Sequence, residues 1–170
     1  QINSNNFGAG STFDLYGISP VAAQNASATG GTDIFYDSTY VYHVFKGSGT
    51  FTPARNLTVD YLVVAGGGGG GPERGGGAGA GGLRSTVGAT GGGGSLESAI
   101  SLTSGTNYTI TVGAGGVGRT NNTNSYSTTQ VGGDSSISGG VISTITSKGG
   151  GGGGANTDNA TGGGGAGGSG

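Results

Sequence analysis

Residues 57–71 read L-T-V-D-Y-L-V-V-A-G-G-G-G-G-G, and this junction between a strand pattern and an unbroken glycine block decides the fold. Val59, Tyr61 and Val63 recur at every second position, the spacing that places side chains on one face of a β-strand. The run 63–65 has no polar residue, which predicts burial on both sides at that end. From residue 66 onward there are no side chains to pack, so contacts of a different kind are needed to continue the fold.

The glycine content divides the chain in two after Ala65. Seven of the 46 glycines lie in residues 1–65 and 39 lie in residues 66–170, whereas ten of the 12 aromatic residues precede the division. Collagen is excluded, because it needs glycine at every third position and abundant proline. Here the glycines come in blocks and the chain has three prolines.

The glycine blocks have two possible interpretations. A flexible linker or disordered tail is the first. The second is a set of rods, because the polyproline-II conformation rises about 3.1 Å per residue and six glycines then form a rod of roughly 19 Å. Backbone N–H and C=O groups would pair between neighbouring rods, and any interior Cβ would force the rods apart. The rod interpretation explains unbroken blocks better, and it makes the intervening segments loops at the rod ends.

Ahead of the glycine blocks the sequence is that of an ordinary β protein. Residues 39–46 (T-Y-V-Y-H-V-F-K) are rich in β-branched and aromatic residues, and the turn signal at 47–49 predicts that they pair with the chain that follows. Residues 1–38 have only short extended patches, at 11–16 and 33–36, and are expected to be an arm, a linker or irregular edge strands.

We therefore predict an all-β fold, in which a short N-terminal β-sheet is followed by a glycine-rich sandwich of polyglycine-II-like rods and β-strands with variable loops. The expected organisation is an N-terminal arm or edge-strand segment at 1–38, a β-hairpin at 39–65 that leads into the glycine-rich part, and a glycine-rich domain at 66–170. The chain begins at Gln1 and ends inside a glycine block, so we expect a processed or partial stretch of a longer polypeptide.

Several functional classes are disfavoured by composition. No run of 18 apolar residues exists, so no transmembrane segment is expected, and the six basic residues are too scattered to predict nucleic-acid binding. The glycine run satisfies the dinucleotide G-x-G-x-x-G pattern, but no helix pattern follows it. His43, the only histidine, lies within a strand pattern and is expected to be a structural side chain. No catalytic, cofactor-binding or metal-binding residue is assigned, and we expect a protein that is not an enzyme.

An ordered set of motifs resembles the glycine-rich domain common in phage tail-fibre and receptor-binding proteins. The set comprises 42–52 (Y-H-V-F-K-G-S-G-T-F-T), 59–65 (V-D-Y-L-V-V-A) leading into six glycines, 79–84 (G-A-G-G-L-R), 108–116 (Y-T-I-T-V-G-A-G-G) and 132–136 (G-G-D-S-S). The resemblance covers about residues 40–154 and is specific as an ordered set. It implies a non-enzymatic, cell-surface-binding or fibre-building role, with loops between polyglycine-II rods that contact the host.

The polar segments between glycine blocks are the candidate receptor- or glycan-binding loops. The candidate residues are Arg119, Asn121, Asn122, Asn124, Tyr126, Asn156 and Asp158. The expected location is the virion, as a tail fibre, and the expected partners are a host-surface glycan or an outer-membrane protein and further copies of the chain, as a trimer or a helical filament. Two alternatives stay open: an extracellular or cell-surface filament assembled by strand exchange through residues 1–38, and an ice-binding polyglycine-II protein.

Overall fold

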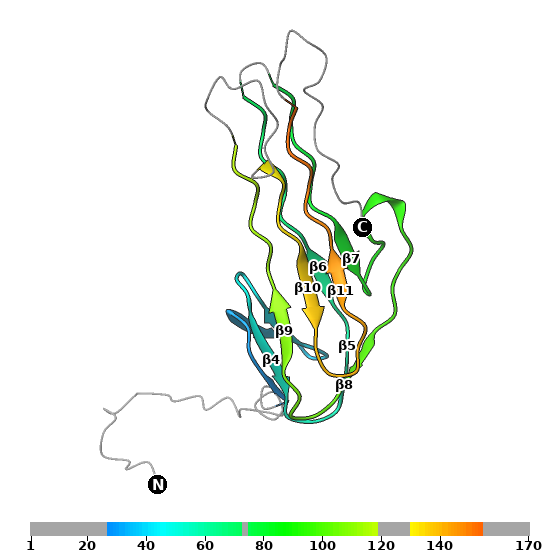
Figure 1. The fold of residues 1–170 in the computed structure, drawn as a ribbon. Helices are drawn as coiled ribbons and strands as arrows, with labels where there is room; N and C mark the ends of the chain where they lie inside the picture. Colours follow the sequence, from blue (N-terminus) through cyan, green and yellow to red (C-terminus); the bar gives the residue numbers. More distant parts are fainter. Residues whose placement is uncertain (1–26, 73–74, 119–129, 155–170) are drawn as a thin grey trace, which may run out of the picture.

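The computed structural model describes residues 27–72, 75–118 and 130–154. Within these ranges the fold is all-β (Figure 1). The elements are β1 (Ala28–Thr29), β2 (Asp33–Tyr36), β3 (Val41–Val44), β4 (Gly49–Pro53), β5 (Leu57–Val59), β6 (Leu62–Val64), β7 (Leu83–Ser85), the short 3-10 helix η2 (Gly91–Gly93), β8 (Ile100–Leu102), β9 (Tyr108–Thr111), β10 (Ser135–Ser138) and β11 (Ile145–Ser147). No helix of the described ranges has the length and apolar character to cross a bilayer.

The strands form one larger sheet and three antiparallel pairs. The larger sheet has the order β1-β4-β9-β10-β11, and the pairs are β2–β3, β5–β8 and β6–β7. β6 lies against β10 and β11, and β11 also contacts β7, so the β6–β7 pair covers part of the larger sheet. The core between them is Tyr61, Val63 and Ile145, with Ile100 and Ile137 packed against it.

The predicted pairing of residues 39–46 with the chain that follows them was wrong. β3 pairs with the preceding strand β2, and β4 pairs with β1 and β9. The reason is a turn at residues 37–40, in which the Asp37 carboxylate accepts hydrogen bonds from the backbone N–H groups of Thr39 and Tyr40, both at 2.7 Å. This use of an aspartate side chain is a common turn device, and it makes 33–44 the hairpin.

The predicted face of the 59–65 strand is confirmed, but its second face is not buried. Tyr61, Val63 and Ala65 are buried, whereas Val64 is 54% exposed. The apolar run at 63–65 therefore does not mark a strand covered on both sides.

Five glycine-rich segments continue the strands as extended rods. They are rod A (66–71), rod B (75–82), rod C (113–118), rod D (130–133) and rod E (149–154). Rods A, C and E follow β6, β9 and β11, and rods B and D precede β7 and β10. In Figure 1 the rods run upward from the strands as one elongated bundle. The sheets therefore pass directly into rods.

Backbone hydrogen bonds between the rods repeat every three residues. Rods A and B are antiparallel, and the donors Ala65, Gly68 and Gly71 reach the carbonyls of Gly82, Gly79 and Gly76. Rods B and E are joined in the same way, from Gly82, Gly79 and Gly76 to Lys148, Gly151 and Gly154. Three residues per turn is the repeat of a polyproline-II helix, which has negative φ, and all seven described glycines with positive φ lie outside the rods. The polyglycine-II-like part of the predicted fold is confirmed.

Rod A contacts all four other rods. Besides its bonds to rod B, it accepts from Gly150 and Gly153 of rod E, accepts from rod C and donates to rod D. Rod D in turn is bonded to rods C and E. Rods C, D and E, which continue the larger sheet, therefore curve around rod A.

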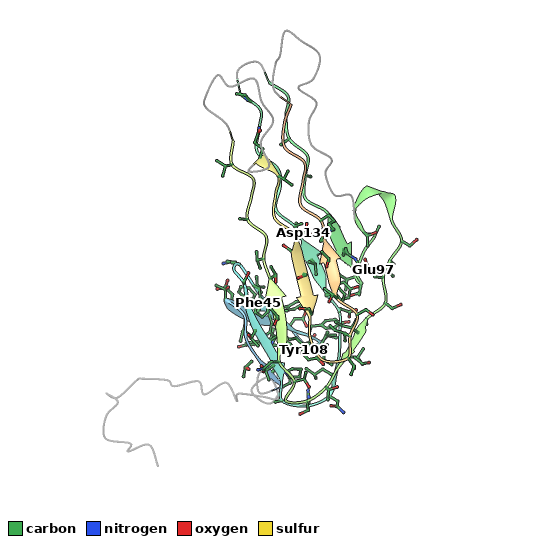
Figure 2. All side chains as sticks on the ribbon, viewed as in Figure 1. Phe45, Glu97, Tyr108 and Asp134 are labelled. Atoms are coloured by element: carbon green, nitrogen blue, oxygen red, sulfur yellow. The ribbon has the colours of Figure 1, made fainter. Side chains whose placement is uncertain are left out.

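The same repeat determines where a side chain can be accommodated. A Cβ at Gly68 or Gly71 would lie 2.1 Å from a carbonyl oxygen of rod E, and one at Gly66 would lie 2.0 Å from an oxygen of rod C. A Cβ at Gly70 would meet nothing within 4 Å. Val117, one of the few larger side chains within the rods, is 66% exposed. Figure 2 accordingly shows side chains crowded around the strands and sparse along the rods.

One glycine block that was expected to behave like the others does not form a rod. Residues 91–93 make the 3-10 turn η2, in which Gly92 and Gly93 have φ of 67° and 80°. Such left-handed conformations favour glycine. Here the block reverses the chain after β7, and the backbone N–H of Glu97 donates to the carbonyl of Ser85.

Candidate functional site

The rods end together at one end of the molecule, which we call the distal end. Its described residues are Pro72, Gly75, Gly118, Gln130 and Gly154. Hydrogen bonds from Gly71 to Gly76 and from Gly76 to Gly154 bring the ends of rods A, B and E together. Rods C and D join them because Val117 and Gln130 both approach Gly69. The segments 73–74, 119–129 and 155–170 are attached at these points.

The seven residues predicted from the sequence to bind a receptor lie outside the described ranges. Arg119, Asn121, Asn122, Asn124 and Tyr126 belong to 119–129, and Asn156 and Asp158 follow rod E. The residues that flank 119–129, Gly118 and Gln130, both lie at the distal end. The binding roles of the seven candidate residues remain proposals.

Gln130 ends the polar segment between glycine blocks that begins at Arg119, and it belongs to the bundle. It is fully buried. Its backbone carbonyl accepts from Gly69 at 2.7 Å, and its side-chain amide donates to the carbonyls of Gly70 at 3.0 Å and Gly153 at 3.4 Å. The amide therefore ties rods A and E together where rod D begins. Its position within a polar, asparagine-rich stretch concealed this role.

Two adjacent side chains fasten the opposite, proximal ends of the rods to the strands. Asp134 accepts from the N–H of Gly149 at 2.9 Å and from Lys148 Nζ at 2.7 Å, and Ser135 Oγ accepts from the N–H of Gly113 at 2.9 Å. The hydrogen bond from Lys148, followed by that from Gly149, lowers the pKa of Asp134. The G-G-D-S-S motif at 132–136 thus sets where rods C, D and E begin or end.

A second cluster of ionisable groups joins β6, β7 and the residues that follow η2. Arg84 donates to the Glu97 carboxylate through Nε at 2.7 Å and Nη2 at 2.6 Å, and Tyr61 donates its hydroxyl to the same carboxylate. The Arg84 hydrogen bonds hold the pKa of Glu97 below its usual range. Burial, followed by the bond to Glu97, raises the pKa of Tyr61 to about 12. Because the carboxylate is engaged on both oxygens, we interpret the cluster as a structural clamp (Figure 2 labels Glu97).

His43 is a strand side chain, as expected, and it packs against Phe51. Its Nδ1 lies 2.6 Å from the carbonyl oxygen of Gly30, so this nitrogen donates, and its ring meets the Phe51 ring edge-on at 5.0 Å. Among residues 27–72, 75–118 and 130–154, no group of three histidine, cysteine or carboxylate side chains is placed to hold a metal ion.

Chemically, the described arrangement is a scaffold. It presents three chain segments from one end of a bundle whose interior contacts are made almost entirely by backbone groups.

Residues 45–170 match the family described as Glycine-rich domain. No curated protein and no solved structure matches the chain.

Proposed function

Because the chain belongs to the glycine-rich domain family, we propose that it is a non-enzymatic module of a phage tail fibre or adhesin that binds a receptor on the host-cell surface. The receptor in this proposal is a glycan or an outer-membrane protein, the location is the virion, and the binding residues are those of the 119–129 and 155–170 segments.

The observation that carries the proposal is the common distal end of the five rods. Every hydrogen bond between rods among the described residues is made by backbone groups or by Gln130. None of these hydrogen bonds involves residues 119–129. A rigid support with independently variable attached segments is an arrangement that suits recognition of variable surfaces.

The direction in which the chain runs through the fold also supports a fibre module. Ser27, the first described residue, accepts from the N–H of Ala54, and Pro53 accepts from Gly105. These residues lie at the end of β4 that is remote from rod C, because β4 and β9 are antiparallel and β9 runs into that rod. The described part of the chain therefore begins at the end of the larger sheet that is opposite the rods, and the rods extend away from that end.

The test is binding of the labelled full-length chain to a panel of intact bacterial cells. We expect saturable binding to at least one strain. The double variant Asn124→Ala/Tyr126→Ser should bind about tenfold or more weakly, since aromatic residues dominate binding energy at interfaces. Val141→Ser, a change at a side chain that is 90% exposed in the β10–β11 turn, is the matched control and should bind normally. Absence of binding across the panel, or equal binding by the double variant, would contradict the proposal.

The pairing of β1 and β2 limits which residues could assemble a filament by strand exchange. These strands occupy residues 28–29 and 33–36 in the chain's own sheets, so a donated strand would have to come from residues 1–26. Deleting 1–26 should then abolish filaments seen by electron microscopy. The ice-binding alternative draws on the exposed Gly67 and Gly70 of rod A, and it requires thermal hysteresis in the purified protein.

A further inference from the structure

The hairpin formed by β2 and β3, residues 33–44, stands apart from the larger sheet. It is a two-stranded sheet, and no third strand of the described residues pairs with it. Two-stranded hairpins are marginally stable in water unless further strands or a hydrophobic face support them. The support on the β3 side comes from His43, through its contacts with Gly30 and Phe51. β2 is the outer strand, held by its pairing with β3 and by the ion pair between Asp33 and Lys46.

Three of the four side chains of β2 are exposed. Ile34, Phe35 and Tyr36 are 43%, 56% and 56% exposed. Successive side chains of a strand point to opposite faces, so exposure of all three leaves both faces of the strand open. Tyr40 and Tyr42, across the turn, are about half exposed as well. Figure 1 shows this hairpin as the blue segment beside β4, well away from the distal end of the rods.

The hairpin is held in shape despite its exposure. The Asp37 carboxylate fixes the turn, and it also accepts from the Tyr42 hydroxyl at 2.7 Å. The Tyr42 ring lies 6.0 Å from that of Tyr40. A preorganised surface loses less entropy on association.

The centre of the β2 edge also lacks the features that keep edge strands apart, and the charged residues Asp33 and Asp37 lie at its two ends. Exposed edges are usually protected by charged residues, especially lysine, by proline or by bulges. Residues 34–36 read I-F-Y, with neither a charge nor a proline. In an edge-to-edge pairing the backbone groups of β2 hydrogen-bond across the edge, and Ile34, Phe35 and Tyr36, which alternate between the two faces of the strand, pack beside their counterparts in the other copy. Such a contact is smaller than the standard interface of about 800 Å² per partner, so we expect a weak and reversible dimer.

We propose that β2 pairs edge to edge with β2 of a second copy of this chain, antiparallel about a two-fold axis at Phe35. This register places Asp33 of one copy opposite Asp37 of the other. Lys46, whose Nζ is 2.6 Å from Asp33, then lies next to both carboxylates and relieves their repulsion. The pairing converts two marginal hairpins into one four-stranded sheet. It does not depend on the proposed receptor binding, because the hairpin is remote from the distal end.

The first test is the association state of the full-length chain, measured by sedimentation velocity over an about hundredfold range of concentration. We expect a reversible monomer–dimer equilibrium. Tyr36→Lys places a lysine on the edge and should weaken dimerisation about tenfold or more. Val141→Lys adds the same charge at a side chain that is 90% exposed in the β10–β11 turn, and it should leave dimerisation unchanged. A wild-type chain that stays monomeric, or a folded Tyr36→Lys variant that dimerises normally, would overturn the proposal.

The second test reports the register and does not rely on Tyr36→Lys folding. The chain has no cysteine, so a disulfide in Phe35→Cys can form only between copies. Directly opposed Cβ atoms in an antiparallel pair are about 4.5–5.5 Å apart, close to the disulfide range. In a glutathione buffer Phe35→Cys should cross-link about tenfold faster than Val141→Cys. Equal rates for the two variants would contradict pairing at Phe35, whatever the outcome of the receptor assay.

Discussion

Replacing Gly68 by alanine should destabilise the protein, whereas replacing Gly70, two residues along the same rod, should not. An ideal Cβ at Gly68 would lie 2.1 Å from the carbonyl oxygen of Gly151. At Gly70 no atom lies within 4 Å. Neither residue has positive φ, so alanine can adopt both backbone conformations and only the surroundings differ.

The size of the effect follows from the rod spacing. Ordinary carbon–oxygen contact begins near 3.4 Å, so rods A and E must separate by about 1.3 Å to admit the methyl group of Gly68→Ala. That shift lengthens the bonds from Gly150 and Gly153 to rod A, now 2.8 and 2.9 Å, to about 4 Å, beyond hydrogen-bond range. Two lost bonds cost about 1–3 kcal/mol, and overpacking costs are of similar size. We expect a loss of about 2–4 kcal/mol.

Gly70→Ala removes conformational freedom from the unfolded chain without a clash, which stabilises by about 0.4–1 kcal/mol. The two variants should therefore differ by about 3 kcal/mol, or roughly 6–12 °C in Tm for a chain of this size. The assay is urea unfolding followed by circular dichroism, with thermal melts as a second readout. If Gly68→Ala and Gly70→Ala have the same stability, the block is not packed as a rod and the reasoning is refuted.

Three further predictions concern the contacts that fasten strands and rods. Glu97→Gln should cost about 1–3 kcal/mol of unfolding free energy at neutral pH, because Arg84 loses its charged partner. Since the pKa of Glu97 is lowered in the fold, the stability that Glu97 contributes is present above its unfolded-state pKa and is lost as pH falls through the folded value. Urea titrations should therefore show the stabilities of wild type and variant converging in acid. The pKa of Tyr61 is raised to about 12, so the stability that it contributes is present below its unfolded-state pKa and is lost as pH rises through 12. Ultraviolet titration should show a tyrosine ionising near pH 12, and Tyr61→Phe should remove that step. Gln130→Ala should cost about 1–3 kcal/mol by deleting the amide bonds to rods A and E, and an unchanged urea midpoint would argue against the buried position.

Much of the architecture could be predicted from residues 57–71 alone. The alternation of Val59, Tyr61 and Val63 indicated a half-buried strand, and six uninterrupted glycines indicated contacts too close for a Cβ. Both are local patterns with a direct physical meaning. The partner of each strand could not be obtained in this way. The β2–β3 pair depends on the side-chain hydrogen bonds of the Asp37–Tyr40 turn, and partners such as β4 and β9 are far apart in the sequence and leave no local pattern.

The candidate site was less predictable than the fold. The polar composition of 119–130 gave no sign that Gln130 is buried, since a buried amide is satisfied by carbonyls of rods A and E that are far away in sequence. The block at 91–94 looked like the other glycine blocks, yet Gly92 and Gly93 use the left-handed region instead of extending. Composition alone does not distinguish these two uses of glycine, because one depends on rods that lie alongside and the other on a chain reversal.

Amide hydrogen exchange along rod A tests the polyglycine-II interpretation most directly. The N–H groups of Gly66, Gly68, Gly69 and Gly71 donate to neighbouring rods, whereas those of the exposed Gly67 and Gly70 donate to no described residue. Nuclear magnetic resonance of the ¹⁵N-labelled protein should therefore show slow exchange at the four bonded glycines and fast exchange at Gly67 and Gly70, a pattern that repeats every three residues. Uniformly fast exchange across 66–71, as in a flexible linker, would contradict the account.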